Sequence, residues 1–471
     1  MKKLLKNNKF QLFFFITIFT FILCLMSSIS PFYNKLLGGT DSFVFRYGAM
    51  SMKKGLIPYK DFFDHKGIFI YIFNFIGLLI NKKFGVWIVE FVFMFFSLYF
   101  THKIIELFKP GKIKYFIILL VFTFLGVTFE GGNFVEEYAL LPTIFSLYIF
   151  LKYYIMKKVK SIEIVMNGIC FAIVCLLRVN MISLWIINLI YIFINLILNK
   201  DIKNIIKYTL SFVIGIIIVC LPCFIYLVYN NAFLHFINNY IIFNFQYSSV
   251  TISEKFNIFQ LFFNINIIFI AIISSLYLIY NDKKNRKILI INFSCIILNL
   301  LLMSMSGRDY MHYGMTMIPF LIIPYCLLIK ITNSKFRQYL YLFLFAVILI
   351  PNSFKITERI FKVHDYDNKE KLEYVKIVKE NTNKNDRISV YGNSNYIYYL
   401  SDRLSASYYS YQSPIAFIDN NIFEEYIKDI KKEKPKIVVV IKKNDNSKRL
   451  IKLLKKLGYE EIRKDVYKLG E

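Results

Sequence analysis

One stretch decides how this sequence folds. It begins Gly39-Thr40-Asp41-Ser42 and ends Asp61-Phe62-Phe63-Asp64-His65-Lys66-Gly67. It follows directly on an apolar N-terminal segment, and it is too polar to be buried in lipid. Carboxylates lie near both of its ends, separated by the turn sequence Gly55-Leu56-Ile57-Pro58-Tyr59. Charged side chains next to lipid are costly unless they line a hydrated site. The stretch therefore predicts a site at the surface of a membrane.

The composition is that of a membrane protein. Of the 471 residues, 57% are hydrophobic and 19% are charged, and the mean hydropathy is +0.50. Several apolar windows approach the roughly 20 residues that cross a bilayer. Much of the net charge of +27 lies in short loops between these windows, so we expect no nucleic-acid partner. All seven cysteines lie in apolar windows, so no disulfide framework is expected.

The apolar windows predict about eleven transmembrane helices. The expected spans are 11–29, 84–101, 114–129, 138–156, 162–178, 180–198, 208–229, 257–280, 288–304, 313–330 and 337–353. The apolar segment Gly67–Ile80 is too short to cross, and we expect it to lie at the interface. With that assignment the lysine-rich loops all share the side of the N-terminus, as the positive-inside rule requires. We therefore expect a multi-pass protein of the cell membrane with a cytoplasmic N-terminus.

The character of the chain changes near residue 362. Residues 1–362 are predicted to form the transmembrane domain, with a first external loop at 30–83. Residues 363–471 are predicted to form a small α/β domain, because strand-like and helix-like segments alternate there. The strands are expected at 387–391, 436–441 and 465–469, and the helices at 369–379, 422–431 and 447–457. The fold class is thus a polytopic α-helical membrane protein with a small C-terminal α/β domain outside the cytoplasm.

On this topology, unusual polar side chains gather in five loops on the external face. We expect them to line one hydrated cavity, because such residues are costly near lipid. The first loop supplies Asp41, Asp64, His65 and Lys66, and later loops supply Glu136, Glu137, Arg178, Tyr247, Arg308, Tyr310 and His312. Arg308 and His312 are four positions apart, which in a helical turn would place them on one face.

These residue types suit the transfer of a sugar from a phosphate. A carboxylate such as Asp41 can accept the proton of a hydroxyl that attacks an anomeric carbon. A lipid-linked phosphate leaving group needs cations, for which Lys66, Arg178, Arg308 and His312 are candidates. The candidate substrate contacts are His65, Glu136, Glu137, Tyr247 and Tyr310. Asp64 with His65 is a weak pattern for a divalent cation, because two side chains are few ligands.

Each candidate also has a structural interpretation. Asp41 could cap a helix, and Asp64 to Lys66 could form a solvated turn. Arg178, at the end of a span, could extend to lipid headgroups. Of Glu136 and Glu137, one could face the cavity and the other water.

The first-loop motif resembles that of the glycosyltransferase C superfamily. The similarity rests on Thr40-Asp41-Ser42 and on Gly55–Gly67, and it is greatest to bacterial protein O-mannosyltransferases and aminoarabinose transferases. The segments 132–138 and 306–313 also resemble motifs of envelope-polysaccharide members. The resemblance covers the membrane part well and the C-terminal region loosely.

The resemblance implies an inverting transferase on the outer face of the membrane. It would move a sugar from a polyprenyl-phosphate donor to a cell-envelope acceptor such as teichoic acid, polysaccharide, lipid or protein. It implies that Asp41 is the base or acceptor-positioning group, that Asp64 is the second acidic position, and that Lys66 lies near the lipid phosphate. Ile68 stands where many relatives have proline, which leaves the placement of the next helix open. Metal use varies among relatives, so the resemblance implies no particular cation.

Two other functions stay open. An O-antigen-ligase-like transferase that uses a diphosphate carrier predicts a large late external loop, whereas the segment 306–313 is short. A transporter or flippase of lipid-linked sugars predicts internal hydropathy symmetry and charges at mid-span, and the sequence shows neither. The expected partners are the lipid-linked donor, the envelope acceptor and membrane lipid.

Overall fold

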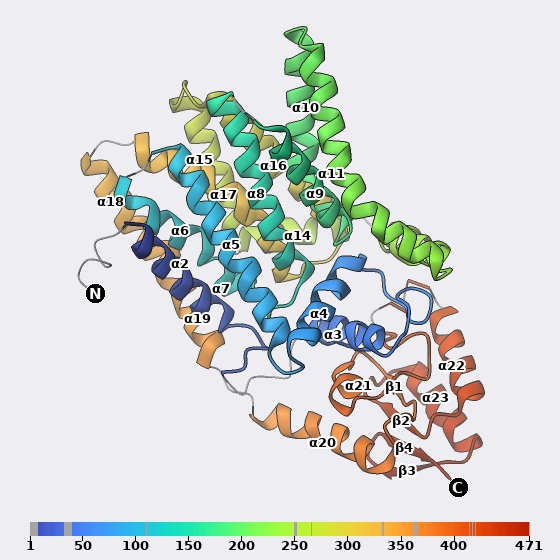
Figure 1. The fold of residues 1–471 in the computed structure, drawn as a ribbon. Coiled ribbons are helices and arrows are strands. Elements are labelled where there is room, and N and C mark those ends of the chain that lie inside the picture. The colour runs from blue at the N-terminus through green and yellow to red at the C-terminus, as the bar shows by residue number, and fades with distance from the viewer. Residues whose placement is uncertain are drawn as a thin grey trace. The chain divides into compact units, whose positions relative to one another are not determined.

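The computed structural model describes residues 8–32, 40–109, 111–157, 159–248, 252–264, 266–331, 334–361, 365–413, 415–416, 418–419 and 421–470. The chain divides into two compact units (Figure 1). Unit 1 comprises Met1–Tyr33, Trp87–Ile225 and Ser248–Lys362, and unit 2 comprises Asn34–Val86, Tyr226–Tyr247 and Val363–Glu471. The predicted domains, 1–362 and 363–471, differ from this division because the first loop folds with the C-terminal region.

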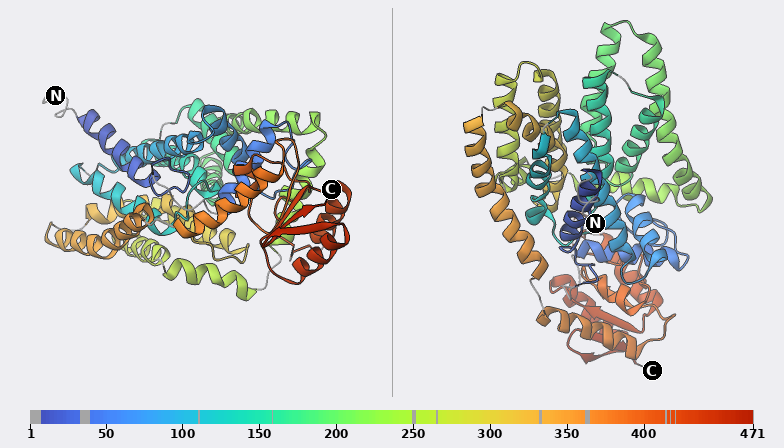
Figure 2. Two further views of the ribbon diagram at one scale, coloured as in Figure 1. Left: turned by 90° about the horizontal axis from the view of Figure 1, so that it is seen from below. Right: turned by 60° about the vertical axis from the view of Figure 1, so that its left-hand side comes forward.

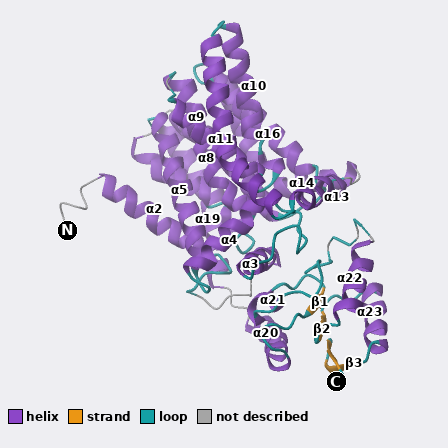
Figure 3. Cartoon of the chain, turned by 45° about the vertical axis from the view of Figure 1, so that its right-hand side comes forward, coloured by secondary structure: helices purple, strands orange, loops and turns teal. Residues whose placement is uncertain are grey.

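The described elements of unit 1 are all helices, as their long apolar runs predict (Figure 3). They are α2 (Asn8–Cys24), α5 (Gly85–Leu107), η1 (Gly111–Ile113), α6 (Lys114–Phe122), α7 (Leu125–Thr128), α8 (Val135–Met156), α9 (Ser161–Cys175), η2 (Val179–Met181), α10 (Ser183–Leu198), α11 (Ile202–Tyr229), α14 (Ile252–Asn264), α15 (Ile267–Asn281), α16 (Arg286–Ser304), η4 (Met311–Met317), α17 (Ile318–Ile331), α18 (Ser334–Leu344), η5 (Phe345–Leu349) and α19 (Ile350–Phe361). The last turn of α11, from Tyr226, belongs to unit 2.

Six of the described helical segments are long and apolar enough to cross a membrane. They are Gly85–Leu107, Val135–Met156, Ile202–Tyr229, Arg286–Ser304, Met311–Lys330 and Ser334–Phe361. Each coincides with a predicted span, which confirms the polytopic helical class. The other predicted spans fall on shorter apolar helices, so the count of about eleven stays a prediction.

One predicted span is not a single continuous helix. The window 257–280 was expected to be a single helix, but the structure has α14 and α15 there, ending at Asn264 and beginning at Ile267. Asn266 caps α15 with a left-handed φ of 59°. A regular helix cannot pass through that conformation, and hydropathy alone does not detect the break.

Unit 2 contains the strands of the described chain. Its elements are α3 (Thr40–Lys53), α4 (Ile68–Ile80), α12 (Phe233–Phe236), η3 (Ile237–Ile242), α13 (Phe243–Tyr247), α20 (Asp365–Asn381), β1 (Ser389–Tyr391), α21 (Tyr396–Ser401), α22 (Asn421–Glu433), β2 (Ile437–Val440), α23 (Asp445–Lys456), β3 (Tyr459–Arg463) and β4 (Val466–Leu469). The sheet order is β1-β2-β4-β3, with β1 parallel to β2 and the other pairs antiparallel. The predicted strands and helices are present, whereas β3 and α21 were not foreseen.

The sheet is covered on both faces. One core contains side chains of α22 and α23, including Tyr426 and Leu450, which pack with Val438 and Val440 of β2. The other core contains α20 and α21, and Phe43, Tyr47 and Met50 of the first-loop helix α3 join it. The Tyr47 hydroxyl also accepts a hydrogen bond, 2.9 Å long, from the backbone N–H of Ser405. The first loop is therefore built into the core of the C-terminal region.

Candidate functional site

Asp64 lies in the short segment between α3 and α4 and is 2% exposed. Its Oδ1 accepts hydrogen bonds from the backbone N–H groups of His65, at 2.6 Å, and Lys66, at 3.0 Å. Burial raises the pKa of the Asp64 carboxyl above its ordinary value, although Tyr71 and Lys66 act in the opposite direction. The predicted acidic position is therefore a rigid, buried carboxyl group rather than a solvated turn.

The C-terminal region contributes directly to this carboxyl group. The Tyr411 hydroxyl donates a hydrogen bond to Asp64 Oδ1 at 3.2 Å and lies 3.3 Å from His65 Nδ1. The backbone N–H of Phe63 donates to the carbonyl oxygen of Tyr408, and the Phe63 ring packs against Tyr409 and Tyr411. The segment around Tyr411 thus fixes Asp64 and His65 from the side opposite their own loop.

The segment 226–247 supplies a third wall. The ring of His65 stacks on that of Tyr247, with centroids 5.5 Å apart and an interplanar angle of 22°. Asn244 Nδ2 donates to the carbonyl oxygen of His65 at 2.6 Å, and Asn239 Nδ2 donates to that of Tyr59 at 3.3 Å. Three distant parts of the sequence therefore meet around the predicted residues Asp64, His65 and Tyr247.

Asp41 lies in the first turn of α3 and is half-buried. A carboxylate there interacts favourably with the helix dipole, which agrees with the structural interpretation of this residue. Asp41 also acts electrostatically on the buried Tyr411 hydroxyl, as Asp64 does, and with burial they raise the pKa of Tyr411 well above its ordinary value. The charges of both first-loop carboxylates therefore act on the same hydroxyl group.

Lys66 follows directly and is half-buried. Its carbonyl oxygen accepts a hydrogen bond, 2.8 Å long, from the hydroxyl of the buried residue Tyr59. Tyr59 in turn has a left-handed φ of 69° within the turn that the sequence predicted. The turn therefore fixes the backbone from which the Lys66 side chain extends.

Unit 1 brings together a second set of predicted residues. Arg178 Nη1 contacts Glu136 Oε1 at 2.5 Å, and Arg178 Nη2 donates to the Tyr313 hydroxyl at 2.6 Å. The guanidinium group lies over the Tyr313 ring, 4.2 Å from its centroid. Glu136 is 1% exposed, so a buried ion pair holds Arg178 in place, where the structural interpretation had it extending to headgroups.

His312 is held between two aromatic rings. Its ring stacks on Phe134 with centroids 4.4 Å apart and on Tyr310 with centroids 5.4 Å apart. His312 Nδ1 lies 2.7 Å from Glu130 Oε2, which also accepts the backbone N–H of His312. Burial opposes ionisation of Glu130, but these hydrogen bonds and the His312 charge lower the pKa of Glu130. Tyr310 and His312 thus form one cluster.

Two expectations for these loops need correction. Arg308 and His312 do not share a helical turn, because residues 307–310 are non-helical and η4, a 3-10 helix, begins at Met311. Glu137 faces neither water nor an open cavity. It is 2% exposed, and its Oε2 accepts the backbone N–H of Asn133 at 2.8 Å. Glu137 therefore fixes the start of α8.

Each unit thus holds its own cluster of predicted residues. Unit 2 holds Asp41, Asp64, His65, Lys66 and Tyr247, and unit 1 holds Glu136, Arg178, Arg308, Tyr310 and His312. The convergence of all five loops on one cavity stays a prediction. Within the described ranges, no three His, Cys, Asp or Glu side chains group closely enough to hold a metal ion. The Asp64–His65 cation site likewise stays a prediction.

Sequence reasoning missed both Tyr411 and Glu130. Tyr411 is one of 35 tyrosines, and it is 347 positions from Asp64. Glu130 precedes the Gly131-Gly132 motif and was assigned no role. Glu130 could have been found from its position, because it directly follows the predicted span 114–129 on the face that also holds the His312 loop.

Comparisons with known proteins address the fold. A family model described as the putative competence-induced protein Ccs4 N-terminal domain matches residues 2–350. No curated protein matches the sequence. The crystal structure of ArnT from Cupriavidus metallidurans bound to undecaprenyl phosphate is similar, with a TM-score of 0.65, 11% identity, and 98% of each chain covered.

A second similar structure is the Archaeoglobus fulgidus oligosaccharyltransferase in complex with Zn and sulfate. Its TM-score is 0.54 at 11% identity, with 90% of this chain and 67% of that chain covered. At such identities the likeness concerns the fold. The chain therefore shares the fold of these two structures, in agreement with the fold that the first-loop resemblance implied.

Proposed function

The chain belongs to the family of the putative competence-induced protein Ccs4 N-terminal domain, and we propose that it is a membrane glycosyltransferase with a lipid-linked donor. Its donor is a polyprenyl-phosphate sugar, and its acceptor is a hydroxyl-bearing component of the cell envelope. The glycosyltransferase C fold supports the reaction class, and the undecaprenyl phosphate bound by ArnT supports the class of carrier.

One observation carries the proposal. The charges of Asp41, half-buried, and Asp64, buried, act on the same Tyr411 hydroxyl, and Lys66 follows Asp64 by two positions. The buried Asp64 carboxyl group, held by two backbone N–H groups and the Tyr411 hydroxyl, is preorganised, which a catalytic site needs and a solvated loop lacks.

The residues suit a single inverting displacement. An acceptor hydroxyl attacks the anomeric carbon while Asp41 takes its proton, and the bond from that carbon to the carrier phosphate breaks. The bonding electrons leave with the phosphate, whose charge Lys66 balances. In this proposal Asp64 orients Lys66 through the hydrogen bond from the Lys66 backbone N–H to its carboxylate.

Unit 1 has residues of its own that suit contact with a phosphate or a sugar. Arg178 can present a planar guanidinium to phosphate oxygens, because Glu136 and Tyr313 fix its orientation. The aromatic stack around His312 leaves Tyr310 38% exposed, which suits contact with a sugar ring or a lipid tail.

The three chain segments that make up unit 2 support the placement of the site outside the cytoplasm. Its three segments, Asn34–Val86, Tyr226–Tyr247 and Val363–Glu471, fall in regions that the positive-inside rule assigns to the external face. Segments that fold into one compact unit must share a side of the membrane, so the fold is consistent with this prediction.

The test is the Asp41→Asn variant in cells that otherwise lack the protein. Mass spectrometry of envelope glycans should show a sugar that is absent in the deletion, restored by wild type and not by Asp41→Asn. Loss of the proton acceptor should slow transfer at least about 100-fold. Asp61→Asn is the matched control, because Asp61 caps its own turn by accepting the Ile57 N–H at 2.7 Å. Restoration of the sugar by Asp41→Asn at the wild-type level would refute the assignment of the base.

A further inference from the structure

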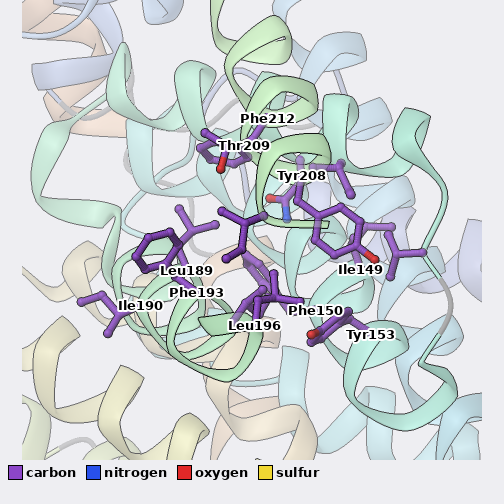
Figure 4. Close-up of a pocket in the computed structure, with 15 residues that line it drawn as sticks. Ile149, Phe150, Tyr153, Leu189, Ile190, Phe193, Leu196, Tyr208, Thr209 and Phe212 are labelled. Atoms are coloured by element: carbon purple, nitrogen blue, oxygen red, sulfur yellow. The ribbon is translucent and has the colours of Figure 1, made fainter. Parts of the chain in front are cut away.

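Unit 1 contains an apolar cavity that the proposed function does not use. Its volume is about 430 Å³, within the range of ligand-binding pockets, and it lies among α8, α9, α10 and α11. Figure 4 shows Phe150 and Tyr153 of α8, Phe193 and Leu196 of α10, and Phe212 of α11 around it. Figure 2 shows α10 and α11 as a helical hairpin.

Two of the helices around the cavity approach each other closely through their backbones. A Cβ atom on Gly168 of α9 would lie 2.1 Å from the carbonyl oxygen of Phe212, and one on Gly215 of α11 would lie 2.1 Å from that of Val165. Phe212 also lines the cavity. The cavity also reaches Val159 in the α8–α9 loop.

The end of the cavity at the α8–α9 loop carries positive charge. Val159 of the α8–α9 loop lines the cavity, and Lys157 and Lys160 lie on either side of it in the sequence. Lys157 Nζ is 5.9 Å from the ring centroid of Tyr153, another lining residue. The nearby Glu163 is engaged by Lys152 Nζ and by the backbone N–H of Lys160. Within the described ranges, neither Lys157 nor Lys160 forms an ion pair, although the charge of Lys160 acts on Glu163, and both side chains are exposed.

We propose that this cavity binds an anionic phospholipid, with an acyl chain among the four helices and the phosphate headgroup at Lys157 and Lys160. An apolar cavity with a basic mouth is complementary to a lipid of this charge. The positive-inside rule assigns the mouth to the cytoplasmic face, whereas the proposed donor acts on the opposite face. The occupant is therefore a phospholipid of the inner leaflet, and the site is separate from sugar transfer.

The test uses the full chain in nanodiscs made from equal parts of phosphatidylglycerol and phosphatidylcholine. Native mass spectrometry then counts the lipids that remain bound after the nanodisc is released. We expect wild type to retain phosphatidylglycerol in preference to phosphatidylcholine. The double variant Lys157→Gln/Lys160→Gln should retain about tenfold less phosphatidylglycerol than wild type, since each lysine near a headgroup contributes to binding. The matched control, Lys283→Gln/Lys284→Gln, changes two exposed lysines of another loop assigned to the same side and should retain as much as wild type.

A second variant tests the apolar part. Thr209→Trp fills the cavity from α11 and should reduce retention of both lipids, while leaving the lysines in place. Equal retention of the two lipids by wild type would overturn the proposal, as would normal phosphatidylglycerol retention in the lysine double variant. Displacement of phosphatidylglycerol by equimolar undecaprenyl phosphate would also overturn it, because the site would then belong to the carrier lipid. If Thr209→Trp does not fold, the lysine variant and its control decide alone.

Discussion

The Asp64 carboxyl group is buried, yet Oδ1 accepts two backbone N–H groups and the Tyr411 hydroxyl. Hydrogen bonds to a carboxylate favour its charged form, whereas burial favours the neutral form. Burial prevails, and the pKa of Asp64 is raised. The protonation state of this group therefore depends on a tyrosine from the C-terminal region.

The variant Tyr411→Phe isolates that dependence. Loss of the hydroxyl removes a donor to the carboxylate, so the pKa of Asp64 should rise further. On the proposed function, the acidic limb of the pH–rate profile should move to higher pH. The plateau rate should fall only about fivefold, as expected for one hydrogen bond. Tyr409→Phe is the control, because the Tyr409 hydroxyl donates to Glu425 instead. An acidic limb at the wild-type pH in Tyr411→Phe would show that the hydroxyl does not tune Asp64.

Asp64 and Glu130 should affect stability with opposite dependence on pH. The raised pKa of Asp64 makes its contribution most favourable below its unfolded pKa of about 3.9, and that contribution is lost as pH rises. The lowered pKa of Glu130 makes its contribution present above about 4.3 and lost as pH falls. Between pH 4 and pH 7, the Tm of Asp64→Asn should therefore rise relative to wild type, and that of Glu130→Gln should fall. Parallel curves for both variants would contradict these assignments.

At the scale of elements, α9 and α11 approach each other through Gly168 and Gly215. Close backbone contact at small residues is a common way for helices to associate in lipid, where the hydrophobic effect does not drive them together. Phe212, whose carbonyl oxygen faces Gly168, also lines the apolar cavity, so this helix contact and the cavity lie side by side.

The variant Gly215→Leu should separate these helices. A side chain at this position meets the carbonyl oxygen of Val165, and overpacking of this kind costs about 1–3 kcal/mol. We expect the Tm of the purified protein to fall by several degrees. The control is Ile214→Leu, whose side chain is 50% exposed on the same helix and should leave the Tm unchanged. An equal Tm for Gly215→Leu and wild type would contradict the close contact.

The elements also show how far the sequence alone can lead. Hydropathy located the helices of unit 1, because burial in lipid imposes a strong local signal. Hydropathy did not predict the break at Asn266, because that break depends on the backbone conformation of a single residue. The first-loop motif identified Asp64 and His65, but Tyr411 became visible only through tertiary contact, since its position carries no local pattern. The pairing of Arg178 with Glu136, 42 positions apart, was unpredictable for the same reason, although both residues were candidates.

At the scale of the whole molecule, unit 2 joins the first loop, residues 226–247 and the C-terminal region. The helix α4 belongs to this unit, and Ile70 and Tyr71 in it are fully buried. The membership of α4 in this unit is consistent with the prediction that α4 does not cross the membrane, which the charge distribution of the loops also favours. The predicted orientation of every later segment therefore depends on α4 not crossing the membrane.

Cysteine labelling tests this topology directly. Lys448 of α23, with a side chain 80% exposed, is a suitable position for a probe. In intact cells, Lys448→Cys should react with a membrane-impermeant maleimide, whereas Lys284→Cys in the α15–α16 loop should react only after the membrane is opened. The native cysteines lie in apolar helices, and the unaltered chain measures their background. If Lys448→Cys requires opening and Lys284→Cys does not, the whole chain is inserted in the opposite orientation, and unit 2 faces the cytoplasm.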